Sequence, residues 1–557
     1  MELETAARVA STAGLCPPQQ GGHAAIEAYE RAVRSAPYDP DLISQLGLLY
    51  SARGLGQQAA DCFRRAIALR PSHAEDHFHL GSELIKAGEI VPAIHSLGAA
   101  VQLRPDYFAA YRQLGALVHG LGDRKAAKAW YQLASRCAPA GCQINLELGT
   151  LCGELGEHEE AAEYFSRSMV SERLGATEYL TIGAGLVKVG QFSRGMECLT
   201  RSIELQPSAW AWTELGYCQF RLRALDSAET SYREALRCDP EYAGAHANLG
   251  LLLLLLGDYV RGFKEFEWRL KLKNFYRMEG FKAPRWAGEP LDGRAILIHA
   301  EQGYGDTLQF LRYVSLVAAR GGEAILAVQP ALHRIGAAYP GVSTCLEIGD
   351  QLPDLDFHCP LMSLPQVFGT TRETVPTLDP LALWGLIGNH QTAGNLSGRP
   401  RPFLVGLTWA GNPNHLSDDQ RSVPLIAFSA LGRVSGAISF VSLQHGVPAK
   451  DLAKRSLPFS IRDACSGVKD FADTAEAIAE LDLVITVDTA IAHLAGSMGK
   501  PVWVLLGTVP EWRWGLEGET TPWYPSMRLF RAEKQGGWKA LMERVAAELE
   551  TAVREAR

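Results

Sequence analysis

The sequence lacks the cysteine patterns of a metal-binding or disulfide-stabilised protein. Its 11 cysteines stand singly along 557 residues, and none belongs to a Cys-x-x-Cys pair. Closely paired cysteines are the usual sign of a zinc site, and even-numbered sets in short secreted chains are the sign of a disulfide framework. We therefore expect no metal site, and reduced, mostly buried thiols as in a cytosolic protein.

Long apolar segments are also missing. Residues 1–14 contain Glu2 and Glu4 and no apolar core of a signal peptide. The longest leucine run, Leu251–Leu256, is far shorter than the about 20 residues that span a bilayer. We expect a cytoplasmic chain without a membrane span.

An excess of positive charge is missing as well. The formal net charge of -8 argues against a broad surface for nucleic acid. With 47% hydrophobic and 21% charged residues, the composition is that of an ordinary globular protein. At about 150 residues per domain, the length predicts three or four domains.

The first half of the sequence repeats itself. Leu-Gly pairs, with one Ile-Gly, recur about every 34 residues, which is the period of tetratricopeptide repeats. They lie at residues 46–47, 80–81, 114–115, 148–149, 182–183, 215–216 and 249–250. Prolines end the units at the same period, and a small residue such as Ala66 or Ala100 recurs where helices must approach closely. We predict about seven helix pairs over residues 24–279, the first truncated, after an N-terminal segment 1–23.

Stacked repeats of this kind form a superhelix with a concave face, which usually holds another protein. The alternative is a scaffold or an oligomerisation arm with no ligand in the groove, because a fold does not fix a function. In either case the repeats themselves catalyse nothing.

After Lys271 the helical period ends, and a new domain begins near residues 280–290. Short apolar runs separated by helical stretches predict the parallel strands of two doubly wound sheets. The predicted strands are Ala295–Ile298, Ala324–Val328, Phe403–Thr408, Ser439–Ser442, Leu483–Val487 and Val502–Leu506. Linker composition over Asp379–Pro402 separates lobes of residues 280–385 and 400–557. The predicted fold is an all-α tetratricopeptide superhelix followed by an α/β fold of two Rossmann-like lobes, the GT-B arrangement of glycosyltransferases.

In open α/β sheets, ligands bind beyond the carboxyl ends of the strands. After Ile298, a glycine-bearing turn opens a helix with Asp306 in its first turn. A transferase that activates an acceptor hydroxyl needs a general base, and Asp306 is the best-placed carboxylate. The alternative is that Asp306 only complements the helix N-terminus.

A second strand end carries an anion-binding pattern. The strand that ends at Val487 leads into Asp488 and Thr489, where a polar cap begins a helix whose free N–H groups can hold a diphosphate. His493 lies about one and a half turns further along. The alternative is a helix cap followed by a buried structural histidine.

Two further strand ends supply candidates for donor binding. Gly411 and Asn412 follow one strand and let the backbone approach a ligand, while Arg421 is placed to neutralise phosphate. Gln444 and His445 follow the next strand and are candidates for contact with a base or ribose. The alternatives are a solvated loop cation at Arg421 and an interface histidine at His445.

Aromatic residues gather near the C-terminus. Trp512, Trp514, Trp523 and Tyr524 surround Arg513 in the sequence. Such a group can stack on a sugar or a nucleobase, but at this density tryptophans more often pack a core. We favour core packing.

Three of these motifs, in this order, resemble the ADP-heptose:lipopolysaccharide heptosyltransferase family over about residues 290–550. They are Gly305-Asp306, Arg421-Ser422-Val423-Pro424 and the helix start from Asp488 to Gly496. The resemblance implies that Asp306 is the base and that Asp488, Thr489 and His493 bind the donor diphosphate. The sequence departs from the family at Glu301-Gln302-Gly303-Tyr304 and at Arg421, which replaces a lysine, so the donor stays open.

The repeat-bearing plan resembles nucleocytoplasmic O-GlcNAc transferases, and also bacterial repeat-bearing transferases that modify proteins such as flagellin in the cytoplasm. In the former, asparagines before the Leu-Gly pairs form a ladder that clamps an extended peptide. Here only Asn248 remains. The other positions hold Gln45, His79, Gln113, Glu147, Thr181 and Glu214. We therefore expect a folded or helical partner docked by side chains.

The predicted function is an inverting, metal-independent transfer of a sugar from a nucleotide-sugar donor to a Ser or Thr hydroxyl of a protein acceptor that the repeats recruit. Oriented donors and cations suffice for such a transfer, so no cofactor is expected. One alternative is a non-catalytic repeat adaptor with a degenerate transferase domain. Another is a heptosyltransferase-like enzyme with a glycan acceptor, although no basic amphipathic helix favours a membrane-bound acceptor.

Overall fold

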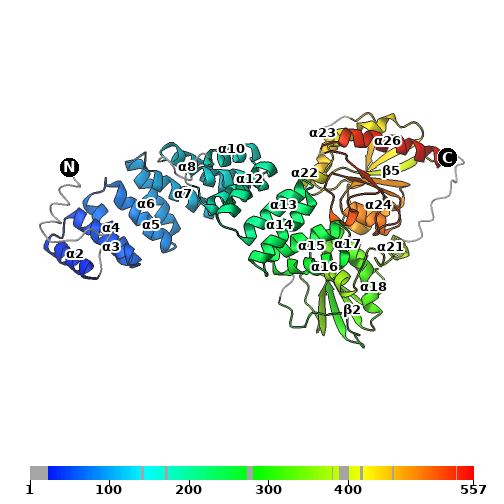
Figure 1. The fold of residues 1–557 in the computed structure, drawn as a ribbon, viewed down its shortest axis with the longest axis horizontal. Coiled ribbons are helices and arrows are strands. Elements are labelled where there is room, and N and C mark those ends of the chain that lie inside the picture. Colours follow the sequence, from blue (N-terminus) through cyan, green and yellow to red (C-terminus); the bar gives the residue numbers. More distant parts are fainter. Residues whose placement is uncertain are drawn as a thin grey trace. The chain divides into compact units, whose positions relative to one another are not determined.

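The computed structural model divides into two compact units by its contacts, Met1–Pro207 and Ser208–Arg557 (Figure 1). It describes residues 23–138, 144–169, 174–272, 280–378, 380–387, 401–413, 418–454, 457–534 and 536–556. The predicted segment 1–23, apart from its last residue, and residues 388–400 of the predicted linker lie outside the described residues. The contact boundary falls inside the predicted repeat array, and the predicted domain limits stay predictions.

The described part of the first unit is entirely helical. From α3 onward the helices pack in consecutive pairs, α3 with α4 through α11 with α12. The helices are α2 (His23–Ser35), α3 (Pro40–Ala52), α4 (Gly56–Leu69), α5 (Ala74–Lys86), α6 (Ile90–Leu103), α7 (Phe108–Gly120), α8 (Arg124–Arg136), α9 (Ile144–Glu154), α10 (His158–Ser168), α11 (Ala176–Lys188) and α12 (Phe192–Leu205). The predicted tetratricopeptide helix pairs are confirmed.

The Leu-Gly signature has a physical cause in this packing. The leucine of each pair lies in the core, while the glycine lets a large side chain of the paired helix touch its backbone. A Cβ atom at Gly115 would lie 2.6 Å from the ring of Tyr131, and one at Gly149 would lie 2.8 Å from the ring of Phe165. Atoms do not approach so closely, so these positions exclude any larger residue.

A second glycine marks the turn inside each pair. Its backbone takes a positive φ, which glycine adopts without steric cost. The turn glycines are Gly54, Gly88, Gly122, Gly156, Gly190 and Gly257. The turn between α13 (Ala209–Arg221) and α14 (Leu225–Cys238) is the exception, because Arg223 stands there with a φ of 64°.

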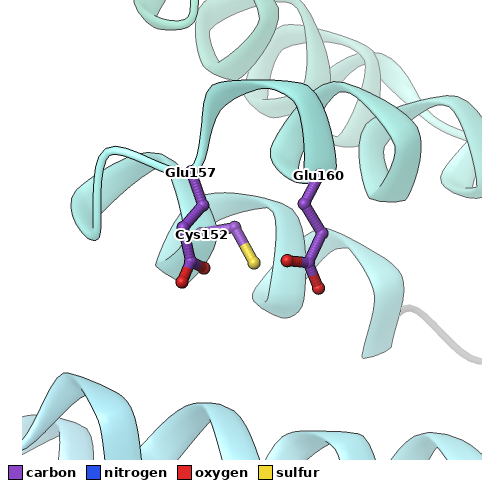
Figure 2. A group of neighbouring side chains, drawn as sticks. All are labelled: Cys152, Glu157 and Glu160. Atoms are coloured by element: carbon purple, nitrogen blue, oxygen red, sulfur yellow. The ribbon is translucent and has the colours of Figure 1, made fainter.

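Figure 2 shows a side-chain group with the composition of a metal site, formed by Cys152, Glu157 and Glu160. The ammonium of Lys128 lies 2.7 Å from Oε2 of each glutamate and neutralises both. Burial raises the pKa of Cys152 to about 12, so its thiol stays protonated. The group is therefore explained by ion pairing between neighbouring repeats.

The second unit begins with the last repeats and continues into two parallel sheets (Figure 1). Its repeat helices are α13 (Ala209–Arg221), α14 (Leu225–Cys238), α15 (Ala243–Leu255) and α16 (Tyr259–Phe266), followed by the 3-10 helix η2 (Glu267–Lys271). The first sheet has the order β3-β2-β1-β4, with β1 (Ala295–His299), β2 (Glu323–Val328), β3 (Thr344–Glu347) and β4 (Phe357–Pro360).

The second sheet has the order β10-β9-β8-β5-β6-β7, and all its neighbouring strands are parallel. Its strands are β5 (Phe403–Thr408), β6 (Ile438–Ser442), β7 (Ile461–Asp463), β8 (Leu483–Val487), β9 (Val502–Leu506) and β10 (Met527–Arg531). The strand order reverses between β8 and β5, which is where such folds bind nucleotides. The predicted α/β fold with two parallel sheets is confirmed.

Helices connect the strands of both sheets. In the first lobe they are α17 (Tyr304–Phe310), η3 (Leu311–Tyr313), α18 (Val314–Ala318), η4 (Pro330–Leu332), α19 (His333–Ala337), η5 (Leu361–Ser363), α20 (Leu364–Val367) and α21 (Pro380–Ile387). In the second lobe they are α22 (Asp418–Arg421), η6 (Leu425–Arg433), η7 (Val447–Lys450), α23 (Asp451–Lys454), α24 (Phe471–Ala479), α25 (Ala490–Ser497), η8 (Trp512–Trp514) and α26 (Trp538–Glu555). Among the described helices, none combines the length and the hydropathy that a bilayer span requires.

Candidate active site

The first-lobe loop between β1 and α17 places Asp306 in the first turn of α17. Gly303 is the N-cap of this helix, and its N–H donates to Asp306 Oδ2 at 3.2 Å. The expected capping contact is therefore present. The role of Asp306 as a base stays a prediction.

The same loop is anchored to the end of the repeats by a buried ion pair. Nη2 of Arg269 in η2 lies 2.8 Å from Glu301 Oε2 and also donates to Ser363 Oγ at 2.8 Å. The backbone N–H of Met362 donates to the same Glu301 oxygen at 3.1 Å. Arg269 and Glu301 are both buried, so the last repeat fixes the start of the loop that carries Asp306.

The second-lobe helix α25 begins as the sequence predicts. Asp488 follows β8, and Thr489 is the N-cap of α25 with extended backbone, but no side chain caps the helix. The Thr489 hydroxyl lies 3.1 Å from that of Thr486. An uncapped helix start at the carboxyl end of a parallel strand is suited to an anion.

The two helix starts meet at Gly305 and His493. A Cβ atom at Gly305 would lie 2.8 Å from the imidazole Cδ2 of His493, so only glycine allows this approach. His493 is buried, its Nδ1 lies 2.9 Å from the Tyr524 hydroxyl, and its ring stacks on Trp514. Burial, aided by nearby arginines, lowers the pKa of His493 well below its usual value, so the ring is neutral. These contacts match the alternative of a structural histidine.

Arg421 and Gly411 lie against each other beside the end of β5. A Cβ atom at Gly411 would lie 2.8 Å from Nε and Nη2 of Arg421, and the Gly411 N–H donates to Ser422 Oγ at 3.0 Å. Arg421 Nε also lies 3.3 Å from Asp418 Oδ1. Asn412, the next residue, is exposed. The structure thus brings the predicted guanidinium and glycine loop together.

Gln444 holds the loop after β5 to the loop after β6. Its Oε1 accepts from the N–H groups of Trp409 and Ala410 at 3.0 and 2.9 Å. Its Nε2 donates to the carbonyls of Ala410 and His445 at 3.0 and 3.1 Å. These four hydrogen bonds use the whole amide, so the geometry supports a positioning role more than contact with a donor.

His445 lies next to a cysteine, a pairing that can signal a nucleophile. Its Nε2 is 3.4 Å from Cys465 Sγ and 3.5 Å from Thr474 Oγ1. Burial raises the pKa of Cys465 to about 12, which keeps the thiol protonated, and desolvation lowers the pKa of His445. The pair therefore does not form the thiolate that nucleophilic chemistry needs.

Sequence reasoning named Arg513 only as part of the aromatic group and did not name Glu511, and both residues follow β9. Arg513 donates from Nη2 to Asp306 Oδ1 at 2.6 Å and from Nη1 to Glu511 Oε2 at 2.8 Å. Arg513 thereby joins the first-lobe base candidate to the second lobe. The signal was the strand-end rule itself, because Glu511 and Arg513 lie in the loop after a predicted strand. The neighbouring aromatic residues indicated core packing, so the charged residues beside them were assigned no role.

Those aromatics pack the core, as favoured from the sequence. Trp512, Trp514, Trp523 and Tyr524 are all buried. The Trp523 Nε1–H donates to the Tyr259 hydroxyl of α16 at 3.0 Å. The aromatic cluster thus fixes the backbone on both sides of Arg513 against the last repeat.

The pKa of Glu511 is raised. Desolvation by the surrounding protein and the negative charges of Asp488 and Asp306 raise it, and Arg513 opposes the shift. Its side chain is nevertheless 40% exposed, so solvent or a ligand reaches it. A reachable carboxyl group with a raised pKa marks a candidate catalytic position.

Two family models match these parts of the chain. Residues 454–545 match glycosyltransferase family 9 (heptosyltransferase), and residues 180–243 and 225–267 match a tetratricopeptide repeat model. The chain joins tetratricopeptide repeats to a glycosyltransferase family 9 domain. The family 9 match includes Asp488, Thr489, Glu511 and Arg513, whereas Asp306 precedes it.

Similar proteins share one or both parts. Protein FlbA of Caulobacter vibrioides is 24% identical over 570 residues, which cover 95% of this chain and 94% of FlbA. A peroxisomal targeting signal receptor of Eremothecium gossypii is 33% identical over 98 residues, 17% of each protein.

Two solved structures illustrate the likeness. MamA is 27% identical, with a TM-score of 0.26, and the match covers 27% of this chain and 86% of MamA. The C-terminal part of a TPR repeat-containing protein from Cytophaga hutchinsonii is 17% identical, with a TM-score of 0.36, and the match covers 40% of this chain and 93% of that one.

Proposed function

We propose that the family 9 domain transfers a sugar from a nucleotide-sugar donor to a hydroxyl of a protein acceptor recruited by the repeats, with inversion and without a metal. The observation that carries the proposal is the meeting of the two helix starts. α17 brings Asp306 to the place where α25 offers an uncapped N-terminus. A base candidate therefore lies in the helix turn that packs against a helix start suited to an anion, and a transfer from a diphosphate leaving group requires both features.

In this proposal the diphosphate binds to the start of α25 at Thr489, with Arg421 as the nearby cation. Backbone N–H groups at a helix start and a guanidinium stabilise the negative charge that develops on a departing diphosphate. In metal-dependent transferases, a bound metal ion stabilises this charge instead. Asp488 lies beside the same helix start and orients the donor.

The acceptor is proposed to dock by side chains. Three of the positions before the Leu-Gly pairs are already engaged in contacts between or within repeats. His79 stacks on Phe63, Gln113 accepts from Ser82 Oγ at 3.0 Å, and Glu147 pairs with Arg112. These side chains do not provide a uniform ladder for a peptide backbone. A folded or helical protein in the cytoplasm, flagellin being one example, suits the surface better.

Thermal unfolding of the full chain with a panel of nucleotides and nucleotide sugars tests the proposal. A ligand that binds only the folded state raises the melting temperature. At a ligand concentration of 100 times its Kd, the folded state is stabilised by about 2.7 kcal/mol. We expect one nucleotide class to act, and the effect to be lost in Arg421→Ala. Arg433→Ala is the matched control, because Arg433 is an exposed arginine of the same lobe.

The absence of a shift with every nucleotide would favour the non-catalytic adaptor. A shift that survives in Arg421→Ala would remove Arg421 from the donor site but leave the transferase standing. Once the donor is known, Asp306→Asn tests whether the transfer step depends on this carboxylate.

A further inference from the structure

Asp306, Asp488 and Glu511 differ in how much of their hydrogen-bonding capacity is already used. Asp306 receives Gly303 N–H on one oxygen and Arg513 on the other, and its side chain is 18% exposed. Asp488 is 10% exposed beside His493. Glu511 is 40% exposed, and among the described residues only Arg513 donates to it, at Oε2.

The charges around Glu511 come from every neighbouring element. Arg513 follows it in η8, Asp306 lies in α17, Asp488 follows β8, and Arg421 belongs to α22, where Asp418 is its partner. His493 of α25 is neutral. With all carboxylates ionised, these groups carry more negative than positive charge. Desolvation and this excess of negative charge raise the pKa of Glu511.

We propose that Glu511 is the carboxylate that takes the proton from the acceptor hydroxyl, with Asp306 holding Arg513 in place. This inference rests on the proposed transferase function. In the step, the acceptor O–H bond breaks and its proton goes to Glu511 Oε1. The acceptor oxygen then bonds to the anomeric carbon, and the bond from that carbon to the phosphate oxygen breaks with its electron pair leaving on the diphosphate.

The geometry assigns complementary roles to the three side chains. Arg513 is nearly buried and donates to Asp306 and Glu511 from different nitrogens, so it fixes the distance between the two lobes' carboxylates. Asp306 accepts hydrogen bonds on both oxygens, whereas Oε1 of Glu511 is left to accept a proton. A carboxylate whose pKa is raised is a stronger proton acceptor than one at its usual pKa.

Isothermal titration calorimetry of the full chain tests the assignment. The ligand is the nucleotide sugar that gives the largest melting shift among UDP-, GDP-, dTDP-, CDP- and ADP-sugars, because its diphosphate does not titrate near neutral pH. Titrations at pH 7 in two buffers of different ionisation enthalpy measure the protons bound. The added negative charge raises the protonated fraction of Glu511, so we expect wild type to take up a fraction of a proton and Glu511→Gln to take up none. Only the ionised Glu511 accepts a proton in the transfer step, so hydrolysis of the nucleotide sugar by wild type should rise with pH, and hydrolysis by Glu511→Gln should lack this rise.

The Asp306→Asn variant distinguishes the role of Asp306 from that of Glu511, because this variant should still take up protons when the nucleotide sugar binds. Glu517→Gln is the matched control, since Glu517 is an exposed glutamate six residues further along. Hydrolysis of the same nucleotide sugar, with water in place of the acceptor, gives the rate. We expect Glu511→Gln to lower kcat by about 10²–10⁴-fold with little change in KM, and Glu511→Asp to retain part of the rate.

The two proposals fail differently. Absence of binding by any nucleotide sugar in wild type would sink the transferase function, and the role of Glu511 with it. Binding with the same proton uptake and the same kcat in wild type and Glu511→Gln would overturn only the Glu511 assignment. Loss of proton uptake in Asp306→Asn but not in Glu511→Gln would return the role to Asp306.

Discussion

At the residue scale, buried polar side chains hold the loops of the site. Gln444 joins two of these loops through its amide, and Arg513 joins two of its carboxylates. Sequence reasoning proposed four site residues, because each follows an apolar run that predicts a strand. They are Asp306, Asp488, Thr489 and Arg421. The sequence did not reveal that Gln444 and His493 are engaged by protein groups, since those partners come from distant segments.

Gln444→Ala should lower the free energy of unfolding of the second unit by about 2 kcal/mol, because it leaves buried N–H groups of Trp409 and Ala410 without a partner. Urea unfolding measures the loss. Lys450→Ala, at an exposed position of the 3-10 helix η7 in the same lobe, should change stability by less than about 0.5 kcal/mol. Equal effects of the two substitutions would argue against the loop-holding role.

His493 should make the protein sensitive to acid. Its folded pKa lies well below its unfolded value, so the unfolded chain binds a proton that the folded chain does not. Its contribution is complete above about pH 6.5 and is lost as pH falls below that value. The melting temperature should therefore drop less between pH 7.5 and 5 in His493→Gln than in wild type. The exposed His95→Gln should follow wild type.

At the element scale, central strands were predictable and edge strands were not. All six predicted strands are present, and the four that sequence reasoning missed are the sheet edges β3, β4, β7 and β10. A central strand is covered on both sides and reads as a continuous apolar run. An edge strand pairs on one side only, and β3 and β7 are partly exposed, so their sequences carry a weaker pattern.

The turn between α13 and α14 contains a correctable strain. Arg223 takes a left-handed backbone conformation that costs a non-glycine residue about 1–2 kcal/mol, partly offset by the greater flexibility of glycine in the unfolded chain. Arg223→Gly should therefore raise stability by about 0.5–1 kcal/mol in urea unfolding. Arg223→Ala removes the same charge but keeps the strain, so it should give no such gain.

At the scale of the whole molecule, the last repeat is part of the second unit. Arg269 pairs with Glu301 in the first lobe, and Tyr259 contacts Trp523 in the second lobe. From the sequence, we predicted the domain boundary near residues 280–290, where the helical period ends. Periodicity indicates secondary structure, but it does not indicate which surfaces pack together, so the contacts between the last repeat and the two lobes were not predicted.

A fragment of residues 208–557 should therefore melt at a higher temperature than a fragment of residues 280–557. The shorter fragment leaves Glu301 without Arg269 and uncovers the tryptophans that pack against α16. Arg269→Met in the full chain isolates the first effect and should cost about 3–5 kcal/mol, because it strands a buried charge. Equal melting temperatures of the two fragments would contradict the shared core.

The leucines of α15 limit how the gene for such a protein can change in length. Leu252 and Leu253 pack with the preceding helices, while Leu254 and Leu255 pack into the core of the sheets. An internal 34-residue unit meets only other units with the same Leu-Gly pattern, so duplication or deletion of whole units preserves the glycine contacts within each helix pair. The final unit has no such equivalent, and lineages are free to lengthen or shorten the array everywhere except at its junction with the enzyme.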